Sequence, residues 1–222
     1  MEDLPLFPLN TVLFPSMPLT LHIFEERYKQ MIAHCLEGDR TFGVLLIREG
    51  SEVGAPAVPF EIVTTAQIIG VERLLEGRMN LVAMGRKRFR LLEITQKRPY
   101  LVGRVEHAPH VLGERIGMLN AAVSVRKSFG EYLDLVAGII EAELKIADLP
   151  ADAASLAYTV AAALQVDNIV KQGLLASDSV KALLENEAQI LPRETARLRL
   201  LTAVEQERKK MNDSKIGSFS KN

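Results

Sequence analysis

The chain has 222 residues, of which 48% are hydrophobic and 25% are charged, and this is the composition of an ordinary globular protein. Its 27 basic and 28 acidic side chains leave a formal net charge of -1, which excludes a strong overall attraction to nucleic acid or to an anionic membrane. A single cysteine, Cys35, excludes an intramolecular disulfide and a zinc site built from cysteines.

The start of the chain is acidic and is interrupted by prolines, so it lacks the basic and then apolar pattern of a signal peptide. No stretch approaches the roughly 20 apolar residues that are needed to cross a membrane. Together with the single cysteine, these features predict a cytoplasmic protein that has no membrane partner.

The first half of the sequence has the short apolar runs, separated by glycine and proline, that are typical of β-strands. Strands are predicted over residues 4–9 and 18–23, joined by the loop 10–17, and their prolines are expected to confine them to sheet edges or strand ends. A short helix is predicted over residues 25–37, with Gly38 as its C-cap. Further strands are predicted at residues 41–48, 61–74, 80–84, 88–95 and 101–107, with a hairpin turn at Glu76-Gly77.

Beyond about residue 110 the chain becomes rich in alanine and leucine at helical spacing. A long apolar stripe begins with Ile116, Leu119 and Val123 and continues to Leu144, although two glycines interrupt it. Asp152 is predicted to cap a helix over residues 153–164.

The C-terminal third is predicted to hold two more helices. One is expected from Ser177, as its cap, to Ile190, and the last is expected to have Pro192 in its first turn. From Arg208 the chain turns polar and is expected to fray. The predicted organisation is therefore α+β: a mostly antiparallel β-domain over residues 1–110 that can close partly into a barrel, a helical bundle over 111–207, and a flexible polar tail over 208–222.

Several motifs that carry chemistry are absent from the sequence. There is no Gly-x-x-x-x-Gly-Lys-Ser/Thr loop, no Gly-x-Gly-x-x-Gly after a strand, no Gly-x-Ser-x-Gly and no His-Glu-x-x-His. Ser124 and Lys127 match Ser-x-x-Lys, but they lie inside a long amphipathic helix without the partner motifs, so an exposed helix face is the favoured interpretation. The sequence therefore predicts a protein that is not an enzyme and needs no cofactor.

The histidines and the cysteine do not predict a metal site. His107 and His110 flank Ala108-Pro109, where the proline prevents the helical spacing that would align both rings on one ion. His34 and Cys35 are neighbours in a helix, so their side chains point about 100° apart. Cys35 falls on the apolar face of that helix and is expected in the core.

A local cluster of positive charge is formed by Arg86, Lys87, Arg88 and Arg90. On a strand, Arg88 and Arg90 would share one face, with Phe89 on the other. Such a strip could bind phosphates, but aromatic interleaving is limited to Phe89 and the overall charge is balanced. A solvated strand face is therefore the favoured interpretation, with nucleic-acid binding as the alternative.

The opening block, residues 4–19, reads LPLFPLNTVLFPSMPL and resembles the N-terminal signature of the Lon substrate-binding domain family. The continuation HIFEERY, residues 22–28, resembles the stand-alone bacterial members, and the resemblance extends to residues 42–44, 52–54, 66–69 and 85–90. It covers nearly the whole chain. It implies a PUA-like β-domain followed by a helical bundle, acting as a docking module for unfolded or tagged polypeptides without the ATPase and peptidase domains.

Two apolar segments that are broken by prolines are the candidate contacts for a polypeptide. Irregular backbone is costly to bury, so such segments tend to lie at the surface, where Phe and Met make an adaptable apolar patch. The alternative is that Phe14 and Met17 fold back onto the core. The partner expected is an unfolded or extended polypeptide, self-association is left open, and nucleic acid is not favoured. The candidate peptide-binding residues are Leu13, Phe14, Pro15, Met17, Val58 and Phe60.

Overall fold

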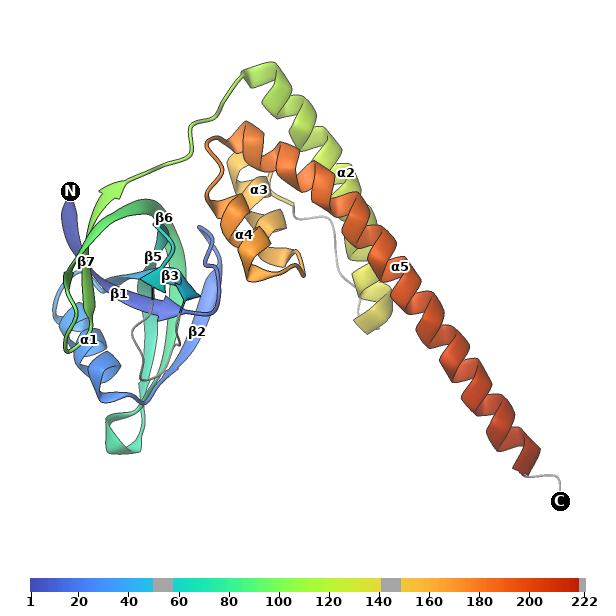
Figure 1. Ribbon diagram of the computed structural model, residues 1–222, viewed down its shortest axis with the longest axis horizontal. Coiled ribbons are helices and arrows are strands. Elements are labelled where there is room, and N and C mark those ends of the chain that lie inside the picture. Colours follow the sequence, from blue (N-terminus) through green and yellow to red (C-terminus); the bar gives the residue numbers. More distant parts are fainter. Residues whose placement is uncertain (50–57, 141–148, 220–222) are drawn as a thin grey trace.

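The computed structural model describes residues 1–49, 58–140 and 149–219 of the chain. A β-barrel and a group of helices lie side by side, and the last helix extends far beyond both (Figure 1). The predicted α+β class is confirmed, because the sheet is mostly antiparallel and the larger helices follow it in the chain.

The barrel is a single sheet that closes on itself. Along it, β1 is followed by β7, β6, β5 and β3, and β3 pairs again with β1. All these pairings are antiparallel except that between β1 and β3. Two further strands extend the sheet, because β2 pairs with β6 and β4 pairs with β3. The strands are β1 (Glu2–Leu9), β2 (Pro18–Ile23), β3 (Thr41–Glu49), β4 (Val58–Pro59), β5 (Ile62–Arg73), β6 (Met79–Gln96) and β7 (Leu101–His107).

The first strand, β1, contains two prolines although it has a neighbouring strand on each side in the closed barrel. Residues Glu2 to Leu6 pair with β7, and residues Leu6 to Leu9 pair with β3. Pro5 therefore has a partner strand on one side only, and so does Pro8, on the opposite side. The expectation of sheet edges or strand ends holds for Pro18, the first residue of β2, and for Pro8, next to the end of β1. It fails for Pro5, since a strand that changes partner halfway tolerates a missing N–H equally well.

The two strands predicted over 80–84 and 88–95 are one continuous strand, β6. Thr64 pairs with Arg88 and Ala66 pairs with Gly85, so Arg86 and Lys87 both stand opposite Thr65. This is a β-bulge, in which one strand has an extra residue and the alternation of side chains is reset. The basic pair therefore interrupts the alternation without interrupting the strand.

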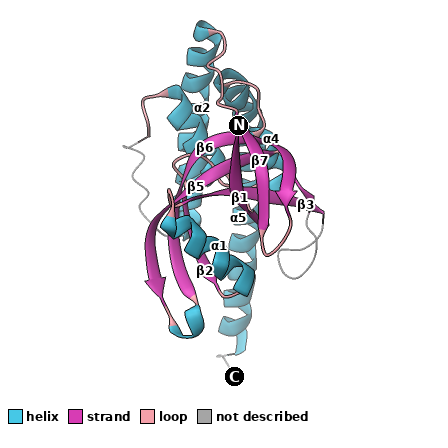
Figure 2. Ribbon diagram, turned by 90° about the vertical axis from the view of Figure 1, so that its left-hand side faces the viewer, coloured by secondary structure: helices cyan, strands magenta, loops and turns pink. Residues whose placement is uncertain are grey.

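Helix α1 (Glu26–Glu37) lies across the barrel on the side away from the other helices (Figure 2). Its Tyr28, Met31, Ile32 and Cys35 are buried, and Gly38 donates its N–H to the Cys35 carbonyl as the predicted C-cap. Burial raises the pKa of the Cys35 thiol to about 12, as expected of a core cysteine. The predicted turn at Glu76-Gly77 is a short 3-10 helix, η1 (Leu75–Gly77).

The remaining helices are α2 (Arg115–Ile140), α3 (Ala153–Ala163), α4 (Asn168–Leu175) and α5 (Val180–Phe219). Helices α2 and α5 lie side by side and run in the same direction (Figure 1). Val180, the first residue of α5, donates its N–H to the carbonyl of Val111, and this bond holds the starts of the two helices together. In the part of the chain that the structure describes, no helix combines the length and the apolar character that a bilayer span requires.

The helix ends agree only in part with the sequence prediction. Asp152 caps α3 as predicted, accepting a hydrogen bond from the Ser155 N–H at 2.7 Å. The α5 cap is Ser179 and not Ser177, since its hydroxyl accepts the Ala182 N–H at 3.1 Å. Pro192 lies inside α5 and does not begin a new helix, and α5 continues through residues 208–219, where the sequence predicts a frayed tail.

The predicted apolar stripe of α2 meets the core only in its second half, where Phe129 is buried and Leu133 and Val136 pack against the same cluster. Ile116, Leu119 and Val123 are 70%, 49% and 72% exposed. Two sets of apolar residues follow the helical period in this segment, and the period alone does not show which set meets a partner. The residues that α2 buries are Met118, Val125, Phe129 and Tyr132.

Among the described residues, one of three hydrophobic clusters spans the barrel and the helices, and the other two lie within the barrel and α1. Val12, Phe14, Leu46 and Ile62 of the barrel side pack in the same buried cluster as the inner faces of α2 to α5. Side-chain amides add hydrogen bonds across the joint: Asn168 donates to the Asn10 carbonyl at 2.6 Å and Gln172 to the Ile62 carbonyl at 3.2 Å. The two parts are thus fixed to each other through buried contacts.

Candidate functional site

The loop 10–17, a candidate peptide-binding surface, is instead part of the joint. The side chains of Leu13 and Phe14 are 1% and 0% exposed, so they present no surface to a peptide. The alternative in which Phe14 folds onto the core is the correct one for this residue. Burial is possible because β6 satisfies the loop backbone: Ser16 donates to the Gly85 carbonyl and Gly85 donates to the Met17 carbonyl, both at 2.9 Å.

Gly85 allows this close approach. A Cβ atom at position 85 would overlap the carbonyl oxygen of Phe14 and would lie 3.0 Å from its carbonyl carbon. Only a glycine at this point of β6 lets the loop backbone lie directly against the strand. The same glycine begins the bulge that carries Arg86 and Lys87.

The other candidate peptide contacts are only partly accessible. Pro15, Met17 and Phe60 are half-buried, and Met17 and Phe60 pack against the core shared by the barrel and the helices. Val58, in β4, pairs through its backbone with Glu49 of β3, and the side chain of Val58 lies outside the part that the structure describes. Leu13 and Phe14 are buried, so among the candidates whose side chains the structure describes only Pro15, Met17 and Phe60 keep partial exposure.

The basic strip is divided by the burial of Arg88. Its guanidinium donates to the Ser177 carbonyl at 3.0 Å, and burial lowers its pKa. Nearby, His110 shares a 2.7 Å hydrogen bond with the Tyr158 hydroxyl, and burial, followed by the charge of Arg88, lowers the pKa of His110 to about 4. Arg88 therefore fixes the helices to the barrel and is not available to phosphates, whereas Arg86, Lys87 and Arg90 are exposed.

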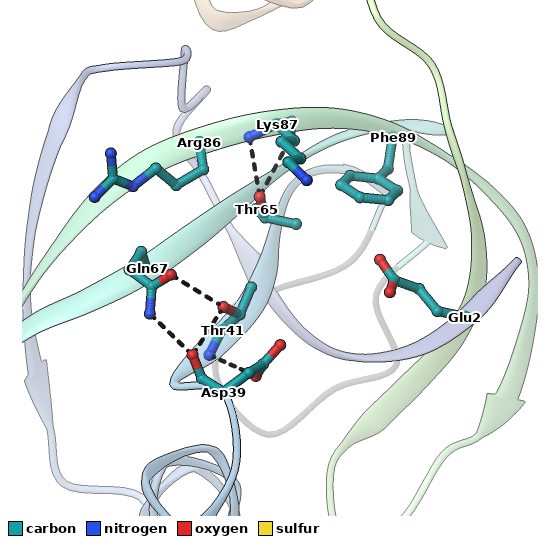
Figure 3. Close-up of a pocket in the computed structure, with 8 residues that line it drawn as sticks. All are labelled: Glu2, Asp39, Thr41, Thr65, Gln67, Arg86, Lys87 and Phe89. Carbon is teal, nitrogen blue, oxygen red and sulfur yellow. Dashed lines mark hydrogen bonds between the residues drawn. The ribbon is translucent and has the colours of Figure 1, made fainter.

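A polar cavity of about 500 Å³ opens on the barrel beside the exposed part of this strip (Figure 3). Four strands and the turn before β3 contribute to it, so its residues are distant in sequence and meet only because the sheet closes. Sequence reasoning identified two of them, Arg86 and Lys87. The lining residues are Glu2, Asp39, Thr41, Thr65, Gln67, Arg86, Lys87 and Phe89.

Hydrogen bonds hold the polar wall of the cavity in place. The Thr65 hydroxyl accepts the Lys87 N–H at 3.0 Å and donates to the Lys87 carbonyl at 3.3 Å (Figure 3). The Gln67 amide donates to the Asp39 carbonyl at 2.9 Å, and one Asp39 carboxylate oxygen accepts the Thr41 N–H at 3.1 Å. The wall is therefore set before any ligand arrives, which limits the entropy lost on binding.

The lining of this cavity combines charged, amide and hydroxyl side chains with one aromatic ring. Its lining has neither histidine nor cysteine, and both threonine hydroxyls take part in hydrogen bonds within the wall. Among the described residues, no three His, Cys, Asp or Glu side chains gather in a group that could hold a metal ion. What the cavity offers is a pair of cations, a pair of carboxylates and a side-chain amide. A glycine followed by two basic residues between two apolar strand halves is the sequence signal that could have indicated the bulge.

The architecture of a barrel joined to a helical group is that of Lon N-terminal domains. The crystal structure of a Lon N-terminal domain protein from Xanthomonas campestris superposes with a TM-score of 0.59 and 26% sequence identity, covering 86% of this chain and 98% of that one. The N-terminal domain of a Mycobacterium avium complex Lon protease superposes with a TM-score of 0.60 at 16% identity, covering 88% of this chain and 98% of that one, and this likeness concerns the fold alone.

The sequence comparisons lead to the same class. Lon protease 2 of Myxococcus xanthus is 26% identical over 207 residues, which are 92% of this chain and 25% of that protein. Lon protease 2 of Syntrophobacter fumaroxidans is 25% identical over 226 residues, covering 96% of this chain and 27% of that protein. The chain spans about a quarter of the length of these relatives.

The family model of the ATP-dependent protease La (LON) substrate-binding domain matches residues 3–193. The chain belongs to this family, and the resemblance carried by the opening block of the sequence is confirmed.

Proposed function

We propose that this protein binds unfolded or extended polypeptide segments and performs no chemistry on them. The observation that carries the proposal is the match of residues 3–193 to a substrate-binding domain. The structure supports it with a preformed polar cavity that is large enough for a few residues of an extended chain.

The binding surface that we propose is centred on this cavity. A polypeptide in extended form exposes backbone amides and carbonyls, and the Gln67 amide and the charged side chains of the lining can hydrogen-bond to them. Of the predicted apolar contacts, Pro15, Met17 and Phe60 keep partly exposed side chains and stay proposed secondary contacts.

Binding to RNA is the alternative that the basic strip suggested. Burial of Arg88 removes one of its four cations, and the carboxylates of Glu2 and Asp39 lie in the same cavity as Arg86 and Lys87. A phosphate backbone would bring repeated negative charge towards these carboxylates. The charge distribution therefore favours a polypeptide over a polyanion.

Fluorescence anisotropy tests the proposal, with a permanently unfolded labelled protein and a labelled single-stranded RNA of similar mass compared at two salt concentrations. Capture of a polypeptide through one or two ionic contacts should lose no more than about tenfold in affinity between about 50 and 200 mM salt, whereas binding through many phosphates should lose about a thousandfold. Tight RNA binding with a steep loss, and weak binding of the polypeptide, would show that the proposal is wrong.

A further inference from the structure

The bulge in β6 places two cations on the same side of the strand. In a regular strand, Arg86 and Lys87 would point to opposite faces of the sheet. Here both stand opposite the single residue Thr65, and both side chains are exposed. Bulges commonly occur where a strand must redirect a side chain towards a site.

Hydrogen bonds from Thr65, on the neighbouring strand β5, hold the bulge in place. The Thr65 side chain is buried, and its hydroxyl bonds to both the N–H and the carbonyl of Lys87, replacing the ladder partner that the extra residue removes. The backbone of Lys87 is thereby held in one position. Within the described part of the chain, neither Arg86 nor Lys87 makes an ion pair, so their charges are available.

The opposite wall of the cavity carries negative charge. In Figure 3 the ends of the Lys87, Glu2 and Asp39 side chains face the same open space, and Arg86 lies at its margin on the side of Gln67. A ligand with one negative group can meet Lys87 while its neighbouring groups lie near the carboxylates. A ligand with negative charge throughout is repelled by Glu2 and Asp39.

We propose that Lys87 binds a single carboxylate of the polypeptide, with the charge of Arg86 at the margin of the cavity adding to the attraction, and that Glu2 and Asp39 select a neutral or basic group next to it. This inference rests on the proposed function and names the chemistry that the site prefers. A carboxylate accepts charge-assisted hydrogen bonds from the Lys87 ammonium, whereas the Arg86 guanidinium, which extends away from Lys87 in Figure 3, attracts it at longer range. It can come from an Asp or Glu side chain or from the C-terminus of the polypeptide.

Short labelled peptides of equal length distinguish these sources. The first has an internal Glu next to a Lys and an amidated C-terminus, the second has Gln in place of Glu, the third has Gln and a free C-terminal carboxylate, and the fourth is acidic throughout. Anisotropy titrations measure their affinities for the full chain. The first or the third peptide, or both, should bind about tenfold more tightly than the second, since one charge-assisted hydrogen bond is worth about that factor. The fourth peptide should bind more weakly than whichever of the first and third binds more tightly.

The variant Arg86→Gln/Lys87→Gln tests the assignment to these residues. It should bind the second peptide as the wild type does and should lose the preference for a carboxylate. Arg90→Gln is the matched control, because Arg90 is an exposed cation on the same strand but outside the cavity, and it should keep that preference. Circular dichroism of both variants checks that they are folded.

The outcomes separate the inference from the function on which it rests. If the wild type binds unfolded polypeptide but does not discriminate between the first three peptides, or if the Arg86→Gln/Lys87→Gln variant keeps the preference, the carboxylate site is refuted and polypeptide binding stands. If the wild type binds neither the peptides nor an unfolded protein, both are refuted.

Discussion

Replacement of Gly85 by Ala should separate the loop 10–17 from the barrel. The added Cβ would overlap the backbone of Phe14, and backbone cannot move aside as the end of a flexible side chain can. The two hydrogen bonds between the loop and Gly85 would be strained or lost, at about 1 kcal/mol each. Partial exposure of the Phe14 ring, which is fully buried, adds to this loss. A total decrease of about 3–5 kcal/mol in the free energy of unfolding is expected.

Urea denaturation followed by circular dichroism measures this change. Gly130→Ala is the matched control: Gly130 lies inside α2, and a Cβ there would meet nothing within 4 Å. This control should be neutral or should gain about 0.5–1 kcal/mol, because alanine is the better helix former. If Gly85→Ala cost less than about 1 kcal/mol, the reasoning that a close backbone contact holds the loop would be refuted.

Three further changes probe the buried joint and the helices. Phe14→Ala should lower the free energy of unfolding by about 3–5 kcal/mol in urea titrations, and a cost typical of a surface residue would contradict its burial. Burial raises the pKa of Glu187 well above 4.5, so the native state keeps a proton that the unfolded chain releases, and the contribution of this group to stability falls as pH rises above about 4.5. Glu187→Gln should therefore gain stability relative to the wild type between about pH 5 and pH 7, by up to about 1.4 kcal/mol per pH unit, and a difference that is the same at both pH values would contradict this. Burial lowers the pKa of His110 to about 4, so the contribution of this group to stability is lost as pH falls from about 6.5 towards 4, in the opposite sense to Glu187. Relative to the wild type, His110→Gln should therefore gain stability as pH falls through this range in the same urea titrations.

The local elements of the fold could be predicted well from the sequence. The strand at residues 18–23 and the Asp152 cap follow from alternation and capping, which depend on neighbouring residues only. Helix α4 has eight residues and no side-chain cap bond, so its sequence gives little sign of a helix. Pro192 suggested a helix start because proline is favoured there, but packing of the long α5 overrides this local preference.

The position of side chains relative to other elements could not be predicted. Phe14 lies in an apolar loop whose burial depends on a glycine 71 positions further along the chain, at Gly85, and no local pattern connects the two. The cavity has the same origin, because Glu2, Asp39 and Lys87 meet only when β1 closes the barrel between β7 and β3. The sequence predicts Arg88 on a solvated strand face with Arg90, but Arg88 is buried against the carbonyl of Ser177, 89 positions further along the chain, and no local pattern indicates this contact.

The central claim is that this chain holds polypeptide without altering it. The most direct measurement is a titration of a labelled, permanently unfolded polypeptide with the full chain in the absence of nucleotide, followed by mass spectrometry of the same samples. The account predicts saturable binding that is competed by unlabelled unfolded polypeptide but not by folded protein, with the mass of the polypeptide unchanged. Absence of saturable binding, or a polypeptide recovered in fragments, would contradict it.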